Sequence, residues 1–408
     1  MNCRFCKTPV NVQFADLVNS PASNSYLTSE QLNEPEVFYP LKVMVCQKCF
    51  LVQVDEYKKS ADIFNSDYAY FSSFSTSWLT HCKKYTEMMI SRFGFKQNSL
   101  VTEIASNDGY LLQFFKEQNV PVLGIEPTAN TAAVAIKKGI PSVVDFFGVR
   151  LATTLVNEGK KTDLLLGNNV LAHVPDIMDF VGGMKLLLKP NGVITMEFPH
   201  LYQLVLNSQY DTIYHEHFSY LSFTTVSQIF EANALQMFDV EEVSTHGGSL
   251  RIFAKHKEDL SKEISNNVVN MLAKEKKAGM LSIDYYSNFQ QKIETIKNDL
   301  LEFLLQQKRL GKKVAAYGAA AKGNTLLNYC GIKNDMISFV VDANPHKQNK
   351  YMPASHIPIV LEERIKNDKP DFIIILPWNI KDEIVKQLDY VKEWGCKFVV
   401  PIPKLEIL

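Results

Sequence analysis

Residues 99–128, SLVTEIASNDGYLLQFFKEQNVPVLGIEPT, alternate between strand and helix patterns and decide the fold. A short apolar strand contains Glu103, a loop and an amphipathic helix follow, and a second apolar strand ends at Glu126. This order predicts a βαβ unit of a doubly wound parallel sheet, whose ligands bind at the carboxyl ends of the strands. A carboxylate after the second strand of such a unit binds the vicinal hydroxyls of a ribose. We therefore expect Glu126 to bind a ribose.

The loop at residues 103–109, EIASNDG, lacks the GxGxxG of dinucleotide-binding loops and the GK[ST] of triphosphate-binding loops. It is similar to the E-x-G-x-G-x-G loop of class I S-adenosylmethionine-dependent methyltransferases, with Ala105 and Asn107 in place of the first two glycines. Asparagine is the residue other than glycine that best tolerates a positive φ, so we expect the turn to be preserved. Small residues would let the backbone approach the methionine part of the cofactor. The cofactor contacts expected here are Glu103, Ala105, Ser106, Asn107 and Gly109.

Three later segments extend this alternation. Asp145 and Phe146 follow a short apolar strand, where they would hold an adenine by a hydrogen bond and a ring contact. Residues 162–176, TDLLLGNNVLAHVPD, predict a fourth strand, and the Lys-Pro-Asn-Gly turn at 189–192 precedes the next one. The predicted fold class is α/β with a doubly wound parallel sheet. Further cofactor contacts expected from these segments are Pro127, Asp145, Phe146 and Asn168.

Length and charge exclude several classes of protein. A chain of 408 residues is too long for one ordinary core and indicates two or three domains. The formal net charge is −1, from 43 basic and 44 acidic side chains, which gives no general attraction for nucleic acid or an anionic membrane. The N-terminus, MNCRFC, lacks the apolar region of a signal peptide, and no apolar run reaches transmembrane length. We expect a cytoplasmic, monomeric protein without nucleic-acid or membrane partners.

Four of the seven cysteines form two C-x2-C pairs, Cys3 with Cys6 and Cys46 with Cys49. Two such pairs complete a tetrahedral four-thiolate zinc site. A redox CxxC and a chance pattern are the alternatives. A site with four protein ligands has no open position, so we expect the zinc to be structural. Only Lys42 is basic in the region from Pro9 to Val45 between the pairs, which argues against a phosphate-binding surface there.

The densest group of proton-transferring side chains is Tyr214-His215-Glu216-His217. Two imidazoles, a carboxylate and a phenol suit acid–base chemistry near neutral pH. A solvated polar turn is the alternative, and a metal site is less favoured because adjacent residues do not share a face. If the segment is extended, His215 and His217 point one way and Tyr214 and Glu216 the other.

Two other stretches carry candidates outside that group. Residues 67–81, DYAYFSSFSTSWLTH, interleave aromatic and hydroxyl side chains, which suggests a linker passing over a pocket. Tyr68 and Tyr70 are its candidate contacts, with plain packing as the alternative. His173 follows the fourth strand, and His246 lies in a Gly-Gly turn; for both, a buried structural histidine is the alternative.

The C-terminal half predicts a second Rossmann-like sheet. Residues 258–309 have helical spacing and are expected to form two or more helices that bridge the domains. A strand then ends at Tyr317, and a Gly-Ala turn opens a helix near Ala321, which makes an anion site to which Lys322 adds charge. This sheet alone would also suit NAD, but it lacks GxGxxG and fits a diphosphate better.

Together these motifs resemble the nucleotide-sugar C-methyltransferases, a family that adds branch methyl groups to deoxysugars. The likeness runs from residue 3 to residue 379. It implies a zinc-binding domain at residues 1–75, a central S-adenosylmethionine-binding domain at 76–255, and a C-terminal nucleotide-sugar-binding domain at 256–408. The motifs are Cys3-x2-Cys6 with Cys46-x2-Cys49, DYAYFSS at 67–73, EIASNDG at 103–109, NNVLAH at 168–173, YHEH at 214–217, HGGSLR at 246–251, YGAAAKGN at 317–324 and PWN at 377–379.

The resemblance also implies the reaction. A 4-keto sugar linked to thymidine diphosphate or another nucleoside diphosphate loses the proton next to the ketone, and the enolate attacks the methyl group of S-adenosylmethionine. His217 is implied as the base. The other implied catalytic residues are Tyr214, Glu216, His173 and Tyr68. The implied substrate contacts are Tyr70, His215, Tyr317, Ala320, Lys322, Asn324, Pro377, Trp378 and Asn379.

Three other functions remain open at the level of the sequence. The first is methylation of oxygen or nitrogen on a similar substrate, which often needs less machinery for an enolate. The second is a zinc-ribbon protein that binds or methylates nucleic acid, which the neutral charge disfavours. The third is an NAD-dependent oxidoreductase that uses the C-terminal sheet.

Overall fold

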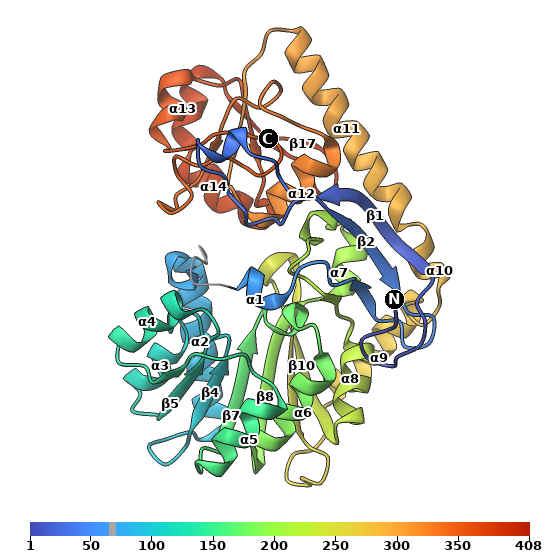
Figure 1. Ribbon diagram of the computed structural model, residues 1–408, viewed down its shortest axis with the longest axis vertical. Coiled ribbons are helices and arrows are strands. Elements are labelled where there is room, and N and C mark those ends of the chain that lie inside the picture. The colour runs from blue at the N-terminus through green and yellow to red at the C-terminus, as the bar shows by residue number, and fades with distance from the viewer. Residues whose placement is uncertain (65–70) are drawn as a thin grey trace.

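The structure is a computed structural model that describes residues 1–64 and 71–408. Across these residues the chain forms three β-sheets with helices packed against them. Figure 1 shows the C-terminal domain at the top, the central domain at the bottom, and strands β1 (Val12–Ser20) and β2 (Tyr39–Val45) at the side between them. The predicted α/β class is confirmed. None of the described helices is both long and apolar enough to cross a bilayer.

The N-terminal sheet is antiparallel and has the strand order β1-β2-β3-β9. The zinc-site cysteines lie before β1 and between β2 and β3. The fourth strand, β9, comes from the middle of the chain and begins two residues after His217. The remaining elements are β3 (Val52–Val54), β9 (Ser219–Tyr220), α1 (Ser60–Ile63) and η1 (Gln31–Asn33).

The central sheet has seven strands in the order β10-β11-β8-β7-β4-β5-β6. The strands from β8 to β6 are parallel, and β11 and β10 extend the sheet in antiparallel fashion. Strands β4 and β7 are buried in its middle, and the continuous apolar run at residues 164–166 of β7 is typical of such a position. The strands are β4 (Val101–Ile104), β5 (Val122–Ile125), β6 (Ser142–Val143), β7 (Thr162–Asn168), β8 (Leu188–Pro199), β10 (Leu235–Val243) and β11 (Ser249–His256).

Helices flank this sheet, and side-chain caps fix where some of them begin. Asp176 accepts hydrogen bonds from the amides of Met178 and Asp179, so α6 starts directly after the turn that contains His173. The helices are α2 (Thr76–Phe93), α3 (Leu112–Glu117), α4 (Ala129–Lys137), α5 (Val149–Asn157), α6 (Ile177–Leu187), α7 (Leu201–Leu206) and α8 (Phe223–Ala232), with η2 (Ser72–Phe74), η3 (Leu171–His173), η4 (Tyr210–Thr212) and η5 (Thr245–Gly247).

The C-terminal sheet has the order β14-β13-β12-β15-β16-β17, parallel except for β17. The predicted bridging helices are present, and α11 runs along the side of the molecule from α10 to the C-terminal domain (Figure 1). The elements are α9 (Asn266–Ala278), α10 (Asp284–Ser287), α11 (Phe289–Arg309), β12 (Val314–Tyr317), α12 (Ala321–Cys330), β13 (Val340–Val341), β14 (Ile359–Val360), α13 (Glu363–Asp368), β15 (Phe372–Ile375), η6 (Trp378–Ile380), α14 (Lys381–Gln387), η7 (Asp389–Trp394), β16 (Lys397–Val400) and β17 (Glu406–Ile407).

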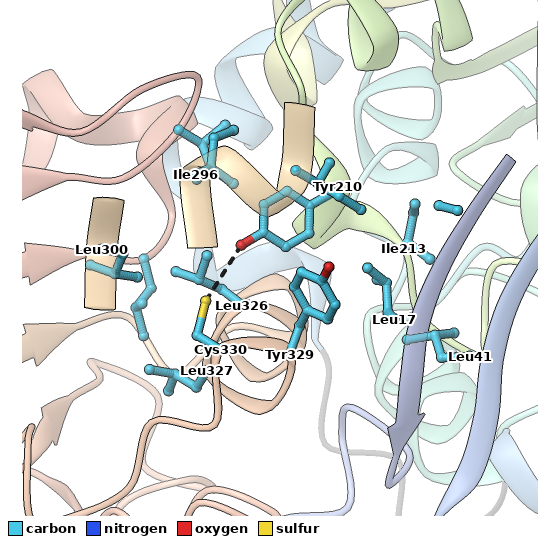
Figure 2. Close-up of a cluster of buried hydrophobic side chains, with 14 of the residues drawn as sticks. Leu17, Leu41, Tyr210, Ile213, Ile296, Leu300, Leu326, Leu327, Tyr329 and Cys330 are labelled. Atoms are coloured by element: carbon cyan, nitrogen blue, oxygen red, sulfur yellow. Dashed lines mark hydrogen bonds between the residues drawn. The ribbon is translucent and has the colours of Figure 1, made fainter. Parts of the chain in front are cut away.

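One hydrophobic cluster joins the three domains. Figure 2 shows Tyr210 and Ile213 of the central domain between Leu17 of β1 and the α12 residues Tyr329 and Cys330. Because these side chains are buried together, the domains are packed as one body rather than linked loosely. The division at residues 75/76 and 255/256 stays a prediction, and β9 shows that a segment from the middle of the chain completes the N-terminal sheet.

Candidate active site

The N-terminal cysteines form a site with the geometry of bound zinc. Sγ of Cys3 lies 3.5 Å from that of Cys49, and Sγ of Cys6 lies 3.5 Å from that of Cys46. All four sulfur atoms lie within 4.8 Å of one another. Zinc–sulfur bonds of about 2.3 Å in a tetrahedron bring sulfur atoms to about this separation. The four thiolates therefore fit a zinc ion and leave it no open coordination position.

A cavity of about 630 Å³ lies between the central and C-terminal sheets. On one side it meets the carboxyl ends of β4 and β7, where Asn107 and Asn168 lie, and on the other the ends of β12 and β15, where Ala320 and Pro377 lie. In each sheet, the connections after these two neighbouring strands run in opposite directions, which creates a crevice for ligands. The N-terminal domain contributes Asn24, so all three domains line the cavity.

The loop after β4 approaches the cavity with an unusual backbone. Ala105 and Asn107 have φ values of 58° and 47°, and Gly109 has 77°. The expected positive φ at Asn107 is confirmed, and Ala105 adopts one as well, which indicates local strain at a ligand site. A Cβ at residue 109 would lie 2.4 Å from Cδ1 of Ile140, so this glycine is needed for packing. Ala105 and Asn107 line the cavity, whereas Ser106 and Gly109 do not.

Glu126 lies on the cavity wall directly after β5, as expected. Its carboxylate accepts hydrogen bonds from the amides of Asn107 and Thr128, each 2.8 Å long. Burial raises its pKa. Glu103 is completely buried inside β4 and does not line the cavity, and burial raises its pKa well above the ordinary value. The structure thus makes Glu126 available to a cofactor and places Glu103 below the loop.

The other expected cofactor contacts also line the cavity, namely Pro127, Asp145, Phe146 and Asn168. Asp145 accepts a 2.8 Å hydrogen bond from the amide of Phe146 and a 2.6 Å one from the Arg150 guanidinium, which fixes its carboxylate. This end of the cavity offers a carboxylate for hydroxyls and apolar walls for a flat ring. Those groups fit the ribose and adenine of S-adenosylmethionine.

The segment at residues 214–217 is a turn rather than an extended strand. The amide of His217 donates to the carbonyl of Tyr214 over 3.0 Å, and the Tyr214 hydroxyl donates to Nε2 of His217 over 2.9 Å. The conditional expectation that His215 would point with His217 is therefore wrong. His215 lies outside the cavity, with Nε2 3.2 Å from the carbonyl of Pro40 and its ring against Tyr39.

Two imidazoles meet on the cavity wall in the same tautomer. Nδ1 of His217 lies 2.9 Å from the carbonyl of Thr212, and Nδ1 of His173 lies 2.7 Å from the carbonyl of Glu216. Because a carbonyl only accepts, each Nδ1 carries the hydrogen and each Nε2 carries the lone pair. The ring centroids are 4.6 Å apart. Burial lowers the pKa of His173 to about 4, and burial with the nearby His173 lowers the pKa of His217 well below its ordinary value.

Glu216 and His246 complete this wall. Oε1 of Glu216 accepts a 3.4 Å hydrogen bond from Nδ2 of Asn24, and burial raises its pKa. His246 has a φ of 53°, and its Nε2 lies 2.6 Å from Nδ2 of Asn169, which has the same φ. Burial lowers the pKa of His246 to about 4. Backbone strain at these two neighbours again marks the ligand site.

The C-terminal wall carries a cation. Nζ of Lys322 donates a 2.6 Å hydrogen bond to Oδ1 of Asn379 and lies 4.6 Å from the ring centroid of Trp378. Among the described residues, no carboxylate oxygen lies within ion-pair distance of Nζ. Helix α12 begins at the same place, and its N-terminal amides have no side-chain cap. This wall therefore suits an anionic group.

Several predicted substrate contacts point elsewhere. Tyr317, Asn324 and Trp378 do not line the cavity, unlike Ala320, Lys322, Pro377 and Asn379. The Tyr317 hydroxyl accepts from Gln387, Nδ2 of Asn324 donates to the carbonyl of Ser23, and the Trp378 indole donates to Asp211. These bonds hold elements together across the fold. Tyr68 and Tyr70 lie outside the described residues.

The residues on the wall that the sequence did not identify as site residues include Asn24, Trp78, Asn169 and Lys347. Asn24 and Lys347 come from loops of the N-terminal and C-terminal domains, and no motif marks them. Trp78 lies within residues 67–81 and Asn169 within residues 162–176, where Asn169 directly follows Asn168. The second asparagine, directly after the end of β7, was the sequence feature that could have identified Asn169 as a site residue.

Comparison with known proteins agrees with this site. Residues 3–64 match a family model described as a zinc binding domain, residues 82–239 a methyltransferase domain, and residues 244–403 a C-methyltransferase C-terminal domain. The C-methyltransferase NovU of Streptomyces niveus is 32% identical over 406 residues, which span 100% of this chain and 96% of NovU.

Solved structures are similar to part of the chain. The magnesium protoporphyrin IX methyltransferase of Synechocystis with bound S-adenosylmethionine is 12% identical and matches with a TM-score of 0.35, over 45% of this chain and 82% of that one. An S-adenosylmethionine-dependent methyltransferase from Clostridium acetobutylicum is 11% identical and has a TM-score of 0.35, over 44% and 92% of the two chains.

The similarity to NovU covers the whole chain, and the three family models match it in succession from the zinc site to the C-terminal sheet. The cavity supplies groups that fit S-adenosylmethionine, and the four cysteines fit zinc. The chain therefore belongs to the family of S-adenosylmethionine-dependent C-methyltransferases that carry an N-terminal zinc-binding domain.

Proposed function

We propose that this C-methyltransferase methylates the carbon next to the ketone of a 4-keto deoxysugar linked to a nucleoside diphosphate, with His217 as the general base. The observation that carries the proposal is that two neutral imidazoles and a phenol, in contact with one another, line the same cavity as Lys322 and the expected cofactor contacts. A proton acceptor, a hydroxyl donor and a cation thus line a single cavity.

The chemistry requires a ketone because only an adjacent carbonyl makes a C–H bond acidic enough for a side-chain base. A base with a free lone pair at neutral pH removes this proton, and a hydrogen-bond donor stabilises the oxygen of the resulting enolate. Nε2 of His217 carries that lone pair because its Nδ1 hydrogen is directed at the carbonyl of Thr212. S-adenosylmethionine, when bound, supplies an electrophilic methyl group to the carbon of the enolate.

Tyr214 is suited to the oxyanion. In the structure its hydroxyl donates to Nε2 of His217. When a substrate carbon faces Nε2, rotation about the C–O bond would direct the same hydrogen to the sugar oxygen. The lone pair of His217 and the donor of Tyr214 would then become available in one movement. His173 and Glu216 lie beside them on the wall, and in this proposal they would orient the sugar hydroxyls.

The opposite wall supports the nucleotide part of the proposal. A diphosphate would accept hydrogen bonds from Lys322 and from the uncapped amides at the start of α12. Ala320, Pro377 and Asn379 shape this region, and thymidine diphosphate is one candidate carrier. Burial lowers the pKa of Lys322, and a bound anion would favour the charged ammonium.

We also propose where the enzyme is located in the cell and in which oligomeric state it is active. Four zinc-binding thiolates suit the reducing cytoplasm, where cysteines remain free of disulfides. A single chain supplies residues from all three domains to the cavity, so we propose that the monomer is active. Sedimentation of the active enzyme at working concentrations tests this point, and an obligate dimer would contradict it.

The function is tested with labelled S-adenosylmethionine and a panel of nucleotide-sugars, each offered with a 4-keto group and as its reduced 4-hydroxy counterpart. Only the ketones should gain label, and NMR of the product should place the new methyl group on carbon. Methyl transfer to a reduced sugar at a comparable rate, or a methyl group on oxygen or nitrogen, would overturn the proposal.

A further inference from the structure

The turn at residues 214–217, which carries His217, is held in place by contacts with both the N-terminal and the C-terminal domain. On its N-terminal side, η4 packs on α12, where the Tyr210 hydroxyl lies 3.7 Å from Sγ of Cys330 (Figure 2). The Thr325 hydroxyl of α12 also donates a 2.8 Å hydrogen bond to the carbonyl of Ile213. On its C-terminal side, β9 pairs with β3, and the amide of Val54 donates to the carbonyl of Phe218 over 3.1 Å. The position of the turn therefore depends on both domains.

Asp211 makes the polar link between this turn and the C-terminal wall. It is completely buried, and its Oδ2 accepts a 2.7 Å hydrogen bond from the indole of Trp378. A buried indole N–H normally requires such a partner, and a carboxylate is a stronger acceptor than a neutral group. The bond ties η4 of the central domain to η6 of the C-terminal domain.

Trp378 contacts two further parts of the cavity wall. The ammonium of Lys322 lies 4.6 Å from its ring centroid. Its ring edge also packs closely on Gly247, since a Cβ at residue 247 would lie 2.3 Å from Cη2. Gly247 is the neighbour of His246 and has a φ of 87°, so a larger residue there would be strained and would displace the indole. The indole of Trp378 thus contacts Lys322, Gly247 beside His246, and Asp211 of η4.

Asp211 is connected to His217 through the residue that follows it in the chain. Thr212 follows Asp211 in η4, and its carbonyl accepts the Nδ1 hydrogen of His217 over 2.9 Å. This bond sets the tautomer that leaves the Nε2 lone pair of His217 on the cavity side. A shift of η4 would therefore move the acceptor that orients the imidazole.

We propose that Asp211 and Trp378 form a positioning pair that fixes His217 relative to Lys322. The inference rests on the proposed function, because it gives the pair the task of holding the base at a set distance from the anion-binding wall. It reassigns Trp378 from a substrate contact to a residue that acts through Asp211. Neither side chain touches the reacting atoms in this account.

The test uses the zinc-loaded full chain and the Trp378→Phe variant, which keeps an aromatic ring and removes the indole donor. Trp394→Phe is the matched control, because the Trp394 indole donates a 3.0 Å hydrogen bond to the carbonyl of Pro370 in the same domain, remote from the cavity lining. We expect Trp378→Phe to lower kcat roughly tenfold to a hundredfold, as for loss of a hydrogen bond to a charged group. Trp394→Phe should keep kcat within about twofold.

Two further variants separate positioning from general damage. Asp211→Asn keeps an acceptor for the indole and should retain more activity than Asp211→Leu, which removes it. Because both changes break one bond, the double variant Asp211→Leu with Trp378→Phe should lose no more activity than Asp211→Leu alone. The KM for S-adenosylmethionine should stay unchanged throughout, since the pair lies outside the cofactor end.

A second readout needs no substrate. Amide hydrogen exchange at residues 211–217 should accelerate in Trp378→Phe and stay at the wild-type rate in Trp394→Phe. Unchanged exchange and unchanged kcat in Trp378→Phe would overturn the positioning pair, as would additive losses in the double variant. If the wild-type enzyme methylates no 4-keto nucleotide-sugar, the proposed function fails, while the exchange experiment still decides whether the pair fixes the turn.

Discussion

Replacement of Glu126 by glutamine should weaken the binding of S-adenosylmethionine by a predictable amount. The carboxylate accepts hydrogen bonds from the amides of Asn107 and Thr128 and from the Thr128 hydroxyl. A carboxylate has about four lone-pair sites, so about one site remains for a ribose hydroxyl. The ribose would therefore depend on a single charged acceptor that the loop has already positioned.

Loss of a hydrogen bond to a charged group costs about 1.5–3 kcal/mol, which raises the dissociation constant roughly 10- to 150-fold. Glutamine adds a second effect because its NH2 group would face the amide of Asn107 or Thr128, donor against donor. The loop at residues 103–109 should therefore also lose stability. Both changes act at the cofactor end and leave the metal site intact.

Calorimetric titration with S-adenosylmethionine measures the affinity, and Glu117→Gln is the matched control because Glu117 is an exposed carboxylate at the end of α3. Since burial raises the pKa of Glu126, affinity should also fall as the pH is lowered through that raised value, where the carboxyl becomes protonated. An affinity of Glu126→Gln within about twofold of the wild type would refute the assignment of the ribose to this carboxylate.

Three further predictions concern the metal, the cation and pH. Elemental analysis should find about one zinc per chain, and Cys3→Ser should lower the melting temperature more than it changes kcat of the folded fraction. Lys322→Met should weaken binding of the nucleoside diphosphate by roughly tenfold or more while calorimetry shows unchanged affinity for S-adenosylmethionine. Because the pKa of His173 is lowered to about 4 and that of His217 is also lowered, both stay neutral below the ordinary pKa, and the acidic limb of kcat/KM should lie below pH 6.5.

Local patterns in the sequence predicted local structure well. The apolar runs around residues 99–128 indicated the βαβ unit, and Glu126 lies at the cavity because strand ends in a parallel sheet meet at one edge. The two C-x2-C pairs converge because each knuckle needs only a few residues to aim two sulfur atoms at one point. The βαβ unit and each C-x2-C knuckle are defined by short separations along the chain, and zinc chemistry pairs the two knuckles although the sulfur contacts span 40 and 46 residues.

Contacts between distant segments could not be predicted in the same way. His215 was paired with His217 on the premise of an extended segment, yet a turn closed by the Tyr214 carbonyl directs the two rings apart. Asn24 reaches Glu216 across 192 residues of sequence, and no local pattern reports such a pair. Trp378 belongs to a motif near the site, but its indole is directed at Asp211 rather than into the cavity.

Proton removal by His217 is tested most directly by hydrogen exchange at the carbon next to the ketone. The enzyme is incubated in deuterium oxide with a 4-keto nucleotide-sugar, and NMR follows loss of the α-hydrogen signal with and without S-adenosylmethionine. His217→Asn is compared with His215→Asn, whose ring lies outside the cavity.

We expect the wild type to exchange this hydrogen and His217→Asn to lose exchange and methylation together, by about 10²–10⁴-fold, with S-adenosylmethionine affinity unchanged. His215→Asn should retain both activities. Exchange that persists in His217→Asn while methylation fails would contradict the account, because His217 would then position the substrate and another group would remove the proton.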